Sequence, residues 1–170
     1  MGVTVVKCGG AVPAEAVCAD LAGRAGGVVL VHGGAPEIER LSAELGVASR
    51  TLVSPSGVTS RHTDPAMLDV VTLALTGRAK PRLLRALAGN GVPAVGLTGL
   101  DGGLLRARRK PAQRAVRDGR TVIVRDDHSG RVTGVRPQVL RVLLDAGFVP
   151  VVSPPATGED GAPVMLPRFL

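Results

Sequence analysis

The chain has 170 residues, of which 45% are hydrophobic and 21% are charged, and its formal net charge is +7. These proportions are typical of one globular domain, or one and a fraction, with a buried core, and they exclude a disordered chain. No apolar run approaches the ~20 residues of a membrane span, and two Phe without Tyr or Trp offer no aromatic platform for stacking nucleic-acid bases.

The first hundred residues alternate short apolar runs with helical patterns. In chain order we expect a buried strand at residues 3–6, a helix at 13–24, a buried strand at 28–31, a helix at 36–45, an irregular hairpin or loop at 52–60, helices at 63–75 and 80–88, and a strand at 93–97. Gly46 is expected to end the second helix, and Thr63 or Asp64 to cap the third. This rhythm predicts parallel strands joined by helices.

The pattern changes between residues 102 and 135, where short polar strands are expected at residues 104–108, 121–125 and 131–135. We expect a turn at residues 126–130 to join the last two, which together form an exposed antiparallel insertion. A helix at residues 137–146, a strand at 149–152 and a loop from residue 153 follow. The whole chain is predicted to be an α/β protein, a three-layer αβα sandwich with a mostly parallel sheet.

Basic charge is concentrated in this insertion. Residues 101–141 hold eleven basic and four acidic side chains, a difference of +7 that accounts for the whole excess. The segment is interpreted either as a solvated basic face or as a docking surface for an acidic partner. Nucleic acid is disfavoured as that partner because the motifs and aromatic residues of nucleic-acid binders are missing.

Three further residue types carry no predicted chemistry. Cys8 and Cys18 have neither disulfide nor metal-site spacing, so we expect two packing thiols. Asp126, Asp127 and His128 also lack metal-ligand spacing and predict a solvated turn rather than a metal site. Because no signal peptide precedes the first strand, a cytoplasmic protein without a membrane segment is expected.

Two diglycine bends are the candidate binding site. Lys7 precedes Gly9 and Gly10, and a second strand ends at Gly33 and Gly34. Neighbouring parallel strands end at one edge of a sheet, where open α/β folds bind ligands. Bare backbone N–H groups and an ammonium suit phosphate, although tight turns and a solvated lysine would explain the same residues. Neither bend has the spacing of a P-loop or of a dinucleotide fingerprint.

Five ordered motifs, at residues 5–10, 29–35, 60–64, 95–102 and 149–155, resemble the amino acid kinase family. The most similar branch contains N-acetylglutamate kinase and the aminoadipate kinase that acts on a substrate held by a small acidic carrier protein of the LysW type. The stretches at residues 99–102, 108–110 and 127–132 favour the carrier-protein kinase.

The resemblance implies ATP-dependent phosphorylation, with Mg²⁺, of the side-chain carboxylate of an amino acid. Carrier-bound 2-aminoadipate in lysine biosynthesis is the expected acceptor, or a related carrier-bound amino acid. The alternatives are N-acetylglutamate in arginine biosynthesis and a non-catalytic module that binds only the acceptor or the carrier. An ionised carboxylate needs no general base, so alignment and charge neutralisation are the expected contributions of the protein. Full-length relatives are expected to be homodimers.

The family's functional residues fall on matching positions of this chain. Lys7 would be catalytic, and Lys7, Gly9 and Gly10 would contact the nucleotide phosphates. Gly33, Gly34 and Arg61 would bind the acceptor, with the guanidinium on its free carboxylate. No protein metal ligand is expected. The candidate carrier-docking residues are Arg106, Arg108, Arg109, Lys110 and Arg131.

The end of the chain departs from the family pattern. After residue 163 the family continues with an Asn-x-(Asn/Asp)-x-Asp motif, whereas this chain reads Met165-Leu166-Pro167-Arg168. Residues 1–163 are therefore expected to form the acceptor-binding N-terminal part of the kinase domain, with a basic hairpin insertion at about 102–135. Residues 164–170 are expected to be an aberrant tail, and the ATP-binding C-terminal half to be absent, as in a truncated product.

Overall fold

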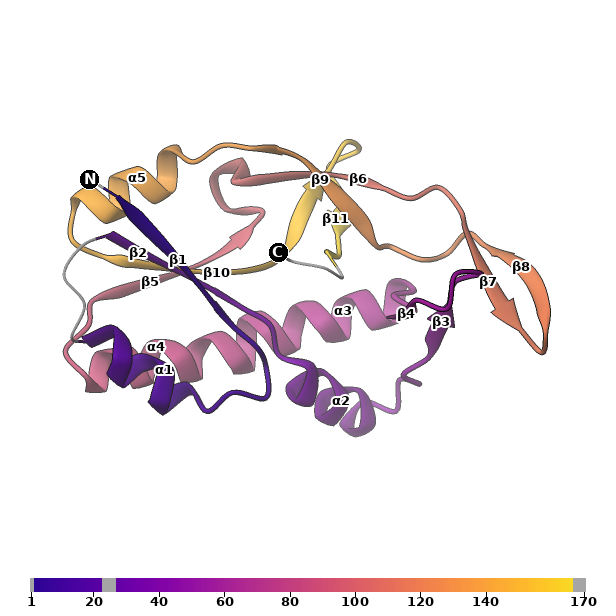
Figure 1. Cartoon of the computed structure of the whole chain (residues 1–170), viewed down its shortest axis with the longest axis horizontal. Helices are drawn as coiled ribbons and strands as arrows, with labels where there is room; N and C mark the ends of the chain where they lie inside the picture. The colour runs from indigo at the N-terminus through magenta and orange to yellow at the C-terminus, as the bar shows by residue number, and fades with distance from the viewer. Residues whose placement is uncertain (1, 23–26, 167–170) are drawn as a thin grey trace.

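The computed structural model of the protein describes residues 2–22 and 27–166. Four parallel strands form the centre of its sheet: β1 (Val3–Cys8), β2 (Gly27–His32), β10 (Val149–Gly158) and β5 (Ala94–Gly99). β2 pairs with β1 and β10, and β5 pairs with β10 (Figure 1). The mostly parallel sheet expected from the sequence is therefore confirmed.

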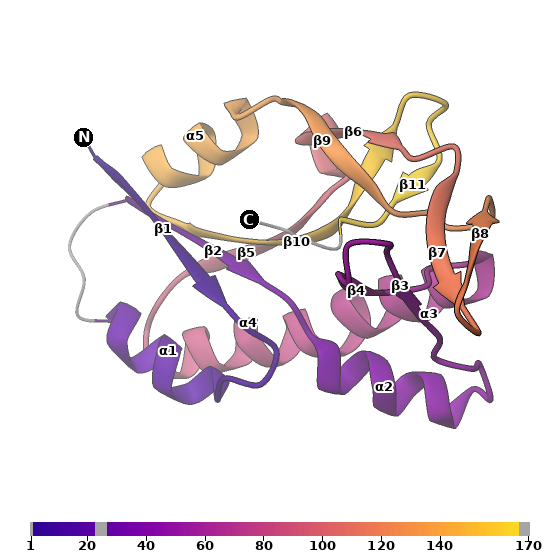
Figure 2. The same ribbon diagram turned by 45° about the vertical axis from the view of Figure 1, so that its right-hand side comes forward.

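Helices cover both faces of this sheet. α1 (Ala14–Ala22) and α4 (Lys80–Gly89) lie on one face, and α5 (Gln138–Asp145) lies on the other (Figure 2). Because side chains of a strand alternate between faces, Val28 and Leu30 pack toward α1 and α4, while Val29 and Val31 pack toward α5. These three layers are the expected αβα sandwich. The expected packing thiols, Cys8 and Cys18, are both free and buried.

One long helix replaces two expected ones. α3 (Pro65–Leu73) continues through a π-helical segment, Ala74–Ala79, directly into α4. Pro81 lacks the N–H that an α-helix would donate to the carbonyl of Gly77. The helix accommodates this proline with a wider, π-helical turn just before it and does not break. Asp64 caps the helix by accepting a 2.9 Å hydrogen bond from the Met67 amide. Within the described ranges, no helix is both long and apolar enough to cross a membrane.

α2 (Ala35–Glu44) lies beside α3 and connects β2 to a small hairpin. The helix is followed by Gly46, whose φ of +68° is the conformation expected of a glycine at a helix end. The hairpin consists of β3 (Thr51–Val53) and β4 (Thr59–Arg61), paired antiparallel, as the sequence predicted. The first expected helix ends at Ala22 in the described chain, and its predicted last residues lie outside the described residues.

The basic insertion consists of two antiparallel pairs, one nested within the other. β6 (Leu105–Arg109) pairs with β9 (Gly130–Val135), while β7 (Gln113–Arg117) pairs with β8 (Arg120–Val124). The expected pairing of residues 121–125 with 131–135 is therefore wrong, although residues 126–130 do connect them. β7 was not predicted from the sequence. Only its central residues are apolar, so it lacks the alternation of apolar and polar residues that indicates a strand.

Two strands differ from their predicted burial or length. β1 is an edge strand rather than a buried one, and its Val3 and Val5 are 54% and 55% exposed. β10 runs to Gly158, where a loop was expected from residue 153. Its first half pairs with β2 and β5, and its second half pairs with β6 and with β11 (Pro163–Val164). Pro154 and Pro155 lie between these halves, at positions to which no strand partner is assigned, so their missing N–H groups remove no hydrogen bond of the sheet.

We expect Leu30→Ala to lower the free energy of unfolding by about 2–5 kcal/mol, because it removes a fully buried side chain from the centre of the sheet. Denaturant titration measures this change. Val142→Ala, on the exposed face of α5, is the control and should change the same quantity by less than about 0.5 kcal/mol. Equal effects of the two substitutions would contradict the assignment of the core.

Candidate functional site

The two diglycine bends touch each other at one edge of the sheet. A Cβ at Gly10 would lie 2.6 Å from the Ala35 nitrogen and 2.7 Å from the Gly34 Cα, so only glycine fits there. The Gly33 amide also donates a 3.1 Å hydrogen bond to the Cys8 carbonyl. The convergence of the bends expected from the sequence is confirmed.

The long helix supports the second bend from behind. A Cβ at Gly34 would lie 2.8 Å from Leu75 Cδ2 and 3.3 Å from the Ala79 Cβ, both in the π-helical segment. The turn therefore favours glycine for close packing rather than for an unusual backbone angle. A Cβ here would require the Leu75 side chain to shift and would crowd the Ala79 Cβ.

A cavity of about 940 Å³ opens beside these bends. The ends of β1 and β2 form its floor, the β3–β4 hairpin forms one side, and the ribbon of β6 and β9 forms the other. The lining includes seven of the residues singled out from the sequence: Lys7, Gly9, Gly33, Gly34, Arg61, Lys110 and Arg131. Gly10 lies behind this group and lines a second cavity of about 500 Å³ between the bends and α4.

The cavity is strongly basic. Lys7, Arg61, Lys110 and Arg131 line it, and no aspartate or glutamate is found among the described residues of its wall. Like charges gathered around one concave surface raise the local concentration of anions and hold them there. The arrangement is suited to a ligand that carries several negative charges.

Arg61 is held in place by groups outside the cavity. Its Nη1 lies 2.6 Å from Glu39 Oε1 and donates a 2.8 Å hydrogen bond to Ser49 Oγ. The side chain is 21% exposed, and a guanidinium has five donors, so other N–H groups stay available for a ligand. Glu39 therefore orients Arg61 without using up its capacity to bind an anion.

Lys7 is exposed because β1 is an edge strand rather than the buried strand expected from the sequence, and water reaches its side chains. Burial alone therefore does not require an anion beside this ammonium. Lys7 shares a face of β1 with Val3 and Val5, and its side chain lines the cavity. The case for an anion here therefore rests on the charge of the whole cavity.

His32 stiffens the second bend as a neutral imidazole. Burial lowers its pKa to about 4, so the ring is uncharged at pH 7. Its Nδ1 lies 3.0 Å from the Gly33 carbonyl oxygen, so this nitrogen carries the proton and donates it. His32 Nε2 is buried without a hydrogen-bond partner among the described residues.

Asp127 lies behind the opposite wall and does not line the cavity, and the expectation of a solvated acid is wrong for it. The side chain is 1% exposed. Its Oδ1 accepts a 2.8 Å hydrogen bond from the Thr63 amide, and its Oδ2 accepts from the Ser129 amide at 3.0 Å. The Ser129 hydroxyl and the Gln113 amide also donate to Oδ2. Asp126 is 61% exposed and pairs with His62 Nε2 at 3.0 Å.

The turn around Asp127 fastens the ribbon to the rest of the domain. The His128 amide donates to the Thr63 carbonyl at 2.7 Å, and the Met165 amide donates to the His128 carbonyl at 2.9 Å. Since Thr63 precedes α3, this network connects the long helix, the ribbon and β11. Met165 lines the cavity and Leu166 is buried, so residues 164–166 pack within the domain; the expected tail from residue 167 lies outside the described residues.

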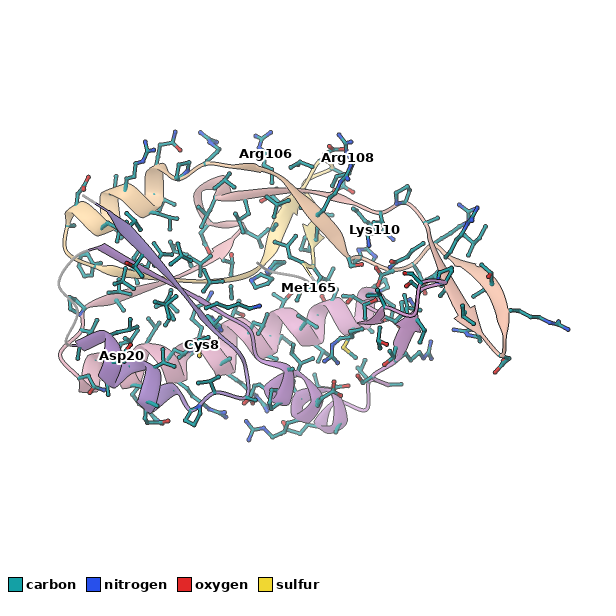
Figure 3. The ribbon with its side chains drawn as sticks, in the orientation of Figure 1. Cys8, Asp20, Arg106, Arg108, Lys110 and Met165 are labelled. Carbon is teal, nitrogen blue, oxygen red and sulfur yellow. The ribbon has the colours of Figure 1, made fainter. Side chains whose placement is uncertain are left out.

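The five candidate docking residues do not behave as one group. Arg106 and Arg108 lie along the outer edge of the ribbon, whereas Lys110 lies between the ribbon and α3 (Figure 3). Arg108 pairs with Glu159 at 2.9 Å. Arg109 donates to the carbonyls of Asp127 and Arg125 at 2.9 and 2.8 Å, which makes it part of the turn.

Among the cavity-lining residues that the sequence did not indicate as site residues are Gln113, Ser129, Met165 and Leu166. Gln113 lies on the undetected strand β7, so no signal indicated where it would point. Ser129 was placed in a solvated turn, and the last two belong to the stretch that departs from the family motif. Met165 and Leu166 reach the cavity because β10 extends to Gly158 and pairs with β11, which directly precedes them.

Comparison with known proteins supports one family. The sequence model of the amino acid kinase family matches residues 2–167. The LysW-aminoadipate kinase of Deinococcus radiodurans is 40% identical over 165 residues, covering 94% of this chain and 56% of that protein. The acetylglutamate kinase of Geobacillus kaustophilus is 41% identical over 168 residues, covering 95% and 59%. The chain spans little more than half the length of these curated relatives.

A solved structure shares the fold. The N-acetylglutamate synthase of Neisseria gonorrhoeae, solved with coenzyme A and N-acetyl-glutamate, matches with a TM-score of 0.68 and 25% identity. The match covers 97% of this chain and 36% of that one. The curled, largely parallel sheet described above is therefore found in a known protein over nearly the whole chain.

We expect Asp127→Asn to lower the free energy of unfolding by about 1–3 kcal/mol. A carboxylate accepts on both oxygens, whereas an asparagine NH₂ must face either the Thr63 amide or the donors from Ser129 and Gln113. Thermal unfolding measures the loss. Asp126→Asn, one residue away and exposed, should cost less than about 1 kcal/mol, and a larger effect there would contradict the assigned network.

Lys80 makes stability depend on pH. It is 6% exposed, its Nζ donates to the Leu97 carbonyl, and burial lowers its pKa from 10.5 to about 8, against the opposing effect of Asp101. Between these two pH values the unfolded chain binds a proton that the folded chain does not, so folding becomes more favourable as pH rises. Relative to Lys80→Met, wild type should gain about 3 kcal/mol across that range. Denaturant titration at several pH values measures this gain. The same change of unfolding free energy with pH in both proteins would contradict the expectation.

Proposed function

This chain belongs to the amino acid kinase family, and we propose that the protein phosphorylates the side-chain carboxylate of an amino acid that a small acidic carrier protein holds by its amino group. The proposed acceptor is 2-aminoadipate, as in the name of the Deinococcus radiodurans relative, and the proposed route is lysine biosynthesis. The observation that carries the proposal is the cavity lined by four cations and no acid among the described residues.

The proposed reaction asks for alignment rather than proton transfer. The acceptor carboxylate is ionised at pH 7 and attacks the γ-phosphorus of ATP, the bond to the β-phosphate oxygen breaks, and an acyl phosphate and ADP result. ATP and Mg²⁺ supply the phosphoryl group and part of the charge neutralisation. The close contact at Gly10 leaves bare backbone at the first bend, which fits an approaching phosphate chain.

Lys7, the glycines of the two bends and Arg61 each have a proposed role in that step. Lys7 would neutralise charge on the phosphoryl group as it transfers, and the amides of Gly9 and Gly10 would contact the nucleotide phosphates. Gly33 and Gly34 would close around the reacting end of the acceptor, and Arg61 would bind its free carboxylate. The bidentate geometry of a guanidinium suits that last contact.

The charge of the cavity favours a carrier-bound acceptor over a small free one. Lys110 and Arg131 come from the basic ribbon, so its positive surface continues into the cavity. A free acylated amino acid carries two carboxylates, and Lys7 and Arg61 are sufficient to meet them. The two additional cations are therefore assigned to negative groups that the carrier brings with it.

The acetylglutamate kinase relative makes N-acetylglutamate the competing acceptor, and salt dependence separates the two. Carrier-bound 2-aminoadipate should bind this chain with an affinity that falls steeply as ionic strength rises, since attraction between charged surfaces is screened. N-acetylglutamate should show a shallow dependence. Isothermal titration at about 0.05 M and 0.3 M salt measures both, with Debye lengths near 14 and 6 Å. If neither acceptor binds, the proposed function is overturned.

We expect Arg131→Gln to weaken binding of the loaded carrier about tenfold, since a charge-assisted hydrogen bond contributes about 1.5–3 kcal/mol. Arg141→Gln on α5 is the matched control because it removes the same charge from an exposed position outside the cavity. Its effect on the dissociation constant should stay within about twofold. Equal losses in the two variants would mean that only net charge matters and that the cavity does not bind the acceptor.

A further inference from the structure

The β7–β8 hairpin has one buried and one exposed face. Its register places Arg114 opposite Ile123 and Ala115 opposite Val122. Since neighbouring residues of a strand point to opposite faces, Ala115 and Val124 lie on the inner face, where they are buried with Leu52 of β3. The outer face holds Arg114, Val116, Thr121, Ile123 and Arg125.

An unusually exposed isoleucine lies at the centre of this outer face. Ile123 is 61% exposed, and of the large hydrophobic side chains in the described part of the chain only Val142 is more exposed. Val116, two pairs along the ladder and on the same face, is 38% exposed. Burying an isoleucine against a partner is favourable by roughly 1.5–3 kcal/mol, so the face offers a binding contact that the fold leaves unused.

Basic side chains flank this apolar centre. Residues 113–125 contain four arginines against the single acid Asp118. Arg114 and Arg125 lie on the outer face with Ile123, while Arg117 and Arg120 pair with each other beside the turn and lie on the inner face. An apolar centre with a charged rim is the usual anatomy of a protein–protein interface, and the sign of the rim selects an acidic partner. A nucleic acid would use the arginines but would leave Ile123 without an apolar contact.

The hairpin begins at the wall of the cavity. Gln113, the first residue of β7, lines the cavity, as does Lys110 just before it. Ile123 pairs with Arg114, the residue that follows Gln113. Two or three extended residues, at roughly 3.3 Å each, would carry a tethered group from the outer face to the cavity mouth.

We infer that the outer face of the β7–β8 hairpin docks the acidic carrier protein that presents the acceptor, with Ile123 buried at the centre of the contact and Arg114 and Arg125 facing carboxylates of the carrier. The inference rests on the proposed function and adds the place where the partner binds. It moves the docking surface away from Arg106 and Arg108 on the ribbon, and from Arg109, whose donors are bound to backbone carbonyls.

The test compares Ile123→Ser with Val142→Ser, which removes an equally exposed apolar side chain from α5. The probes are LysW loaded with 2-aminoadipate and, as a small acceptor without a carrier, N-acetyl-2-aminoadipate. Ile123→Ser should weaken binding of the loaded carrier about tenfold and leave the small acceptor unchanged. Val142→Ser should change neither. Equal melting temperatures of the two variants verify that both fold.

A second variant tests the basic rim independently. Arg114→Glu should weaken binding of the loaded carrier more at low salt than at high salt, because it acts through long-range attraction. Ile123→Ser should lower affinity by the same factor at both salt concentrations. Opposite salt behaviour of the two variants would overturn the division into apolar centre and basic rim.

The outcomes separate this inference from the proposed function. If wild type binds the loaded carrier and Ile123→Ser binds it equally well, the docking face is wrong while the function stands. If wild type binds no loaded carrier, the function fails first. Loss of the small acceptor in Ile123→Ser would place the effect in the cavity and overturn the docking role.

Discussion

The contact between two glycine bends is the constraint on which this site depends. Gly10 lies so close to Gly34 and Ala35 that no side chain fits between them. That contact brings the end of β1, with Lys7, beside the end of β2, with His32. The π-helical segment packs against Gly34 from the other side, so the bend lies between the end of a strand and a helix. This packing determines where the cavity lies and why the backbone beside it carries no side chains.

Asp127 stabilises the far side of the cavity from behind its wall. A buried carboxylate without an ion-pair partner among the described residues is stable only if donors satisfy both of its oxygens, and here four donors from three residues do so. Those donors belong to the start of α3, to β7 and to the turn before β9. The basic ribbon is thereby attached to the domain core, so its lysine and arginine face the glycine bends across the cavity.

The basic residues of the insertion separate into groups with different surroundings. Arg109 is committed to backbone carbonyls and stabilises the turn, and Arg108 pairs with Glu159 at the ribbon's edge. Lys110 and Arg131 line the cavity. Arg114 and Arg125, at the β7–β8 hairpin, flank the exposed Ile123. A net charge read from the sequence treats these positions as equal, whereas their surroundings give them different capacities to meet an anion.

The sequence alone determined the alternation of strands and helices, the parallel sheet and the two glycine bends, because local periodicity and turn chemistry encode these features. The amino acid kinase family was indicated by the resemblance of five ordered motifs. The sequence did not determine β7, the full length of β10, the exposure of Lys7 or the burial of Asp127. Weak apolar alternation hid the first, and two prolines at a change of strand partner hid the second. The last two depend on which segments lie beside them in space. A strand's burial and a carboxylate's donors are set by residues tens of positions away, and only the tertiary structure brings those residues together.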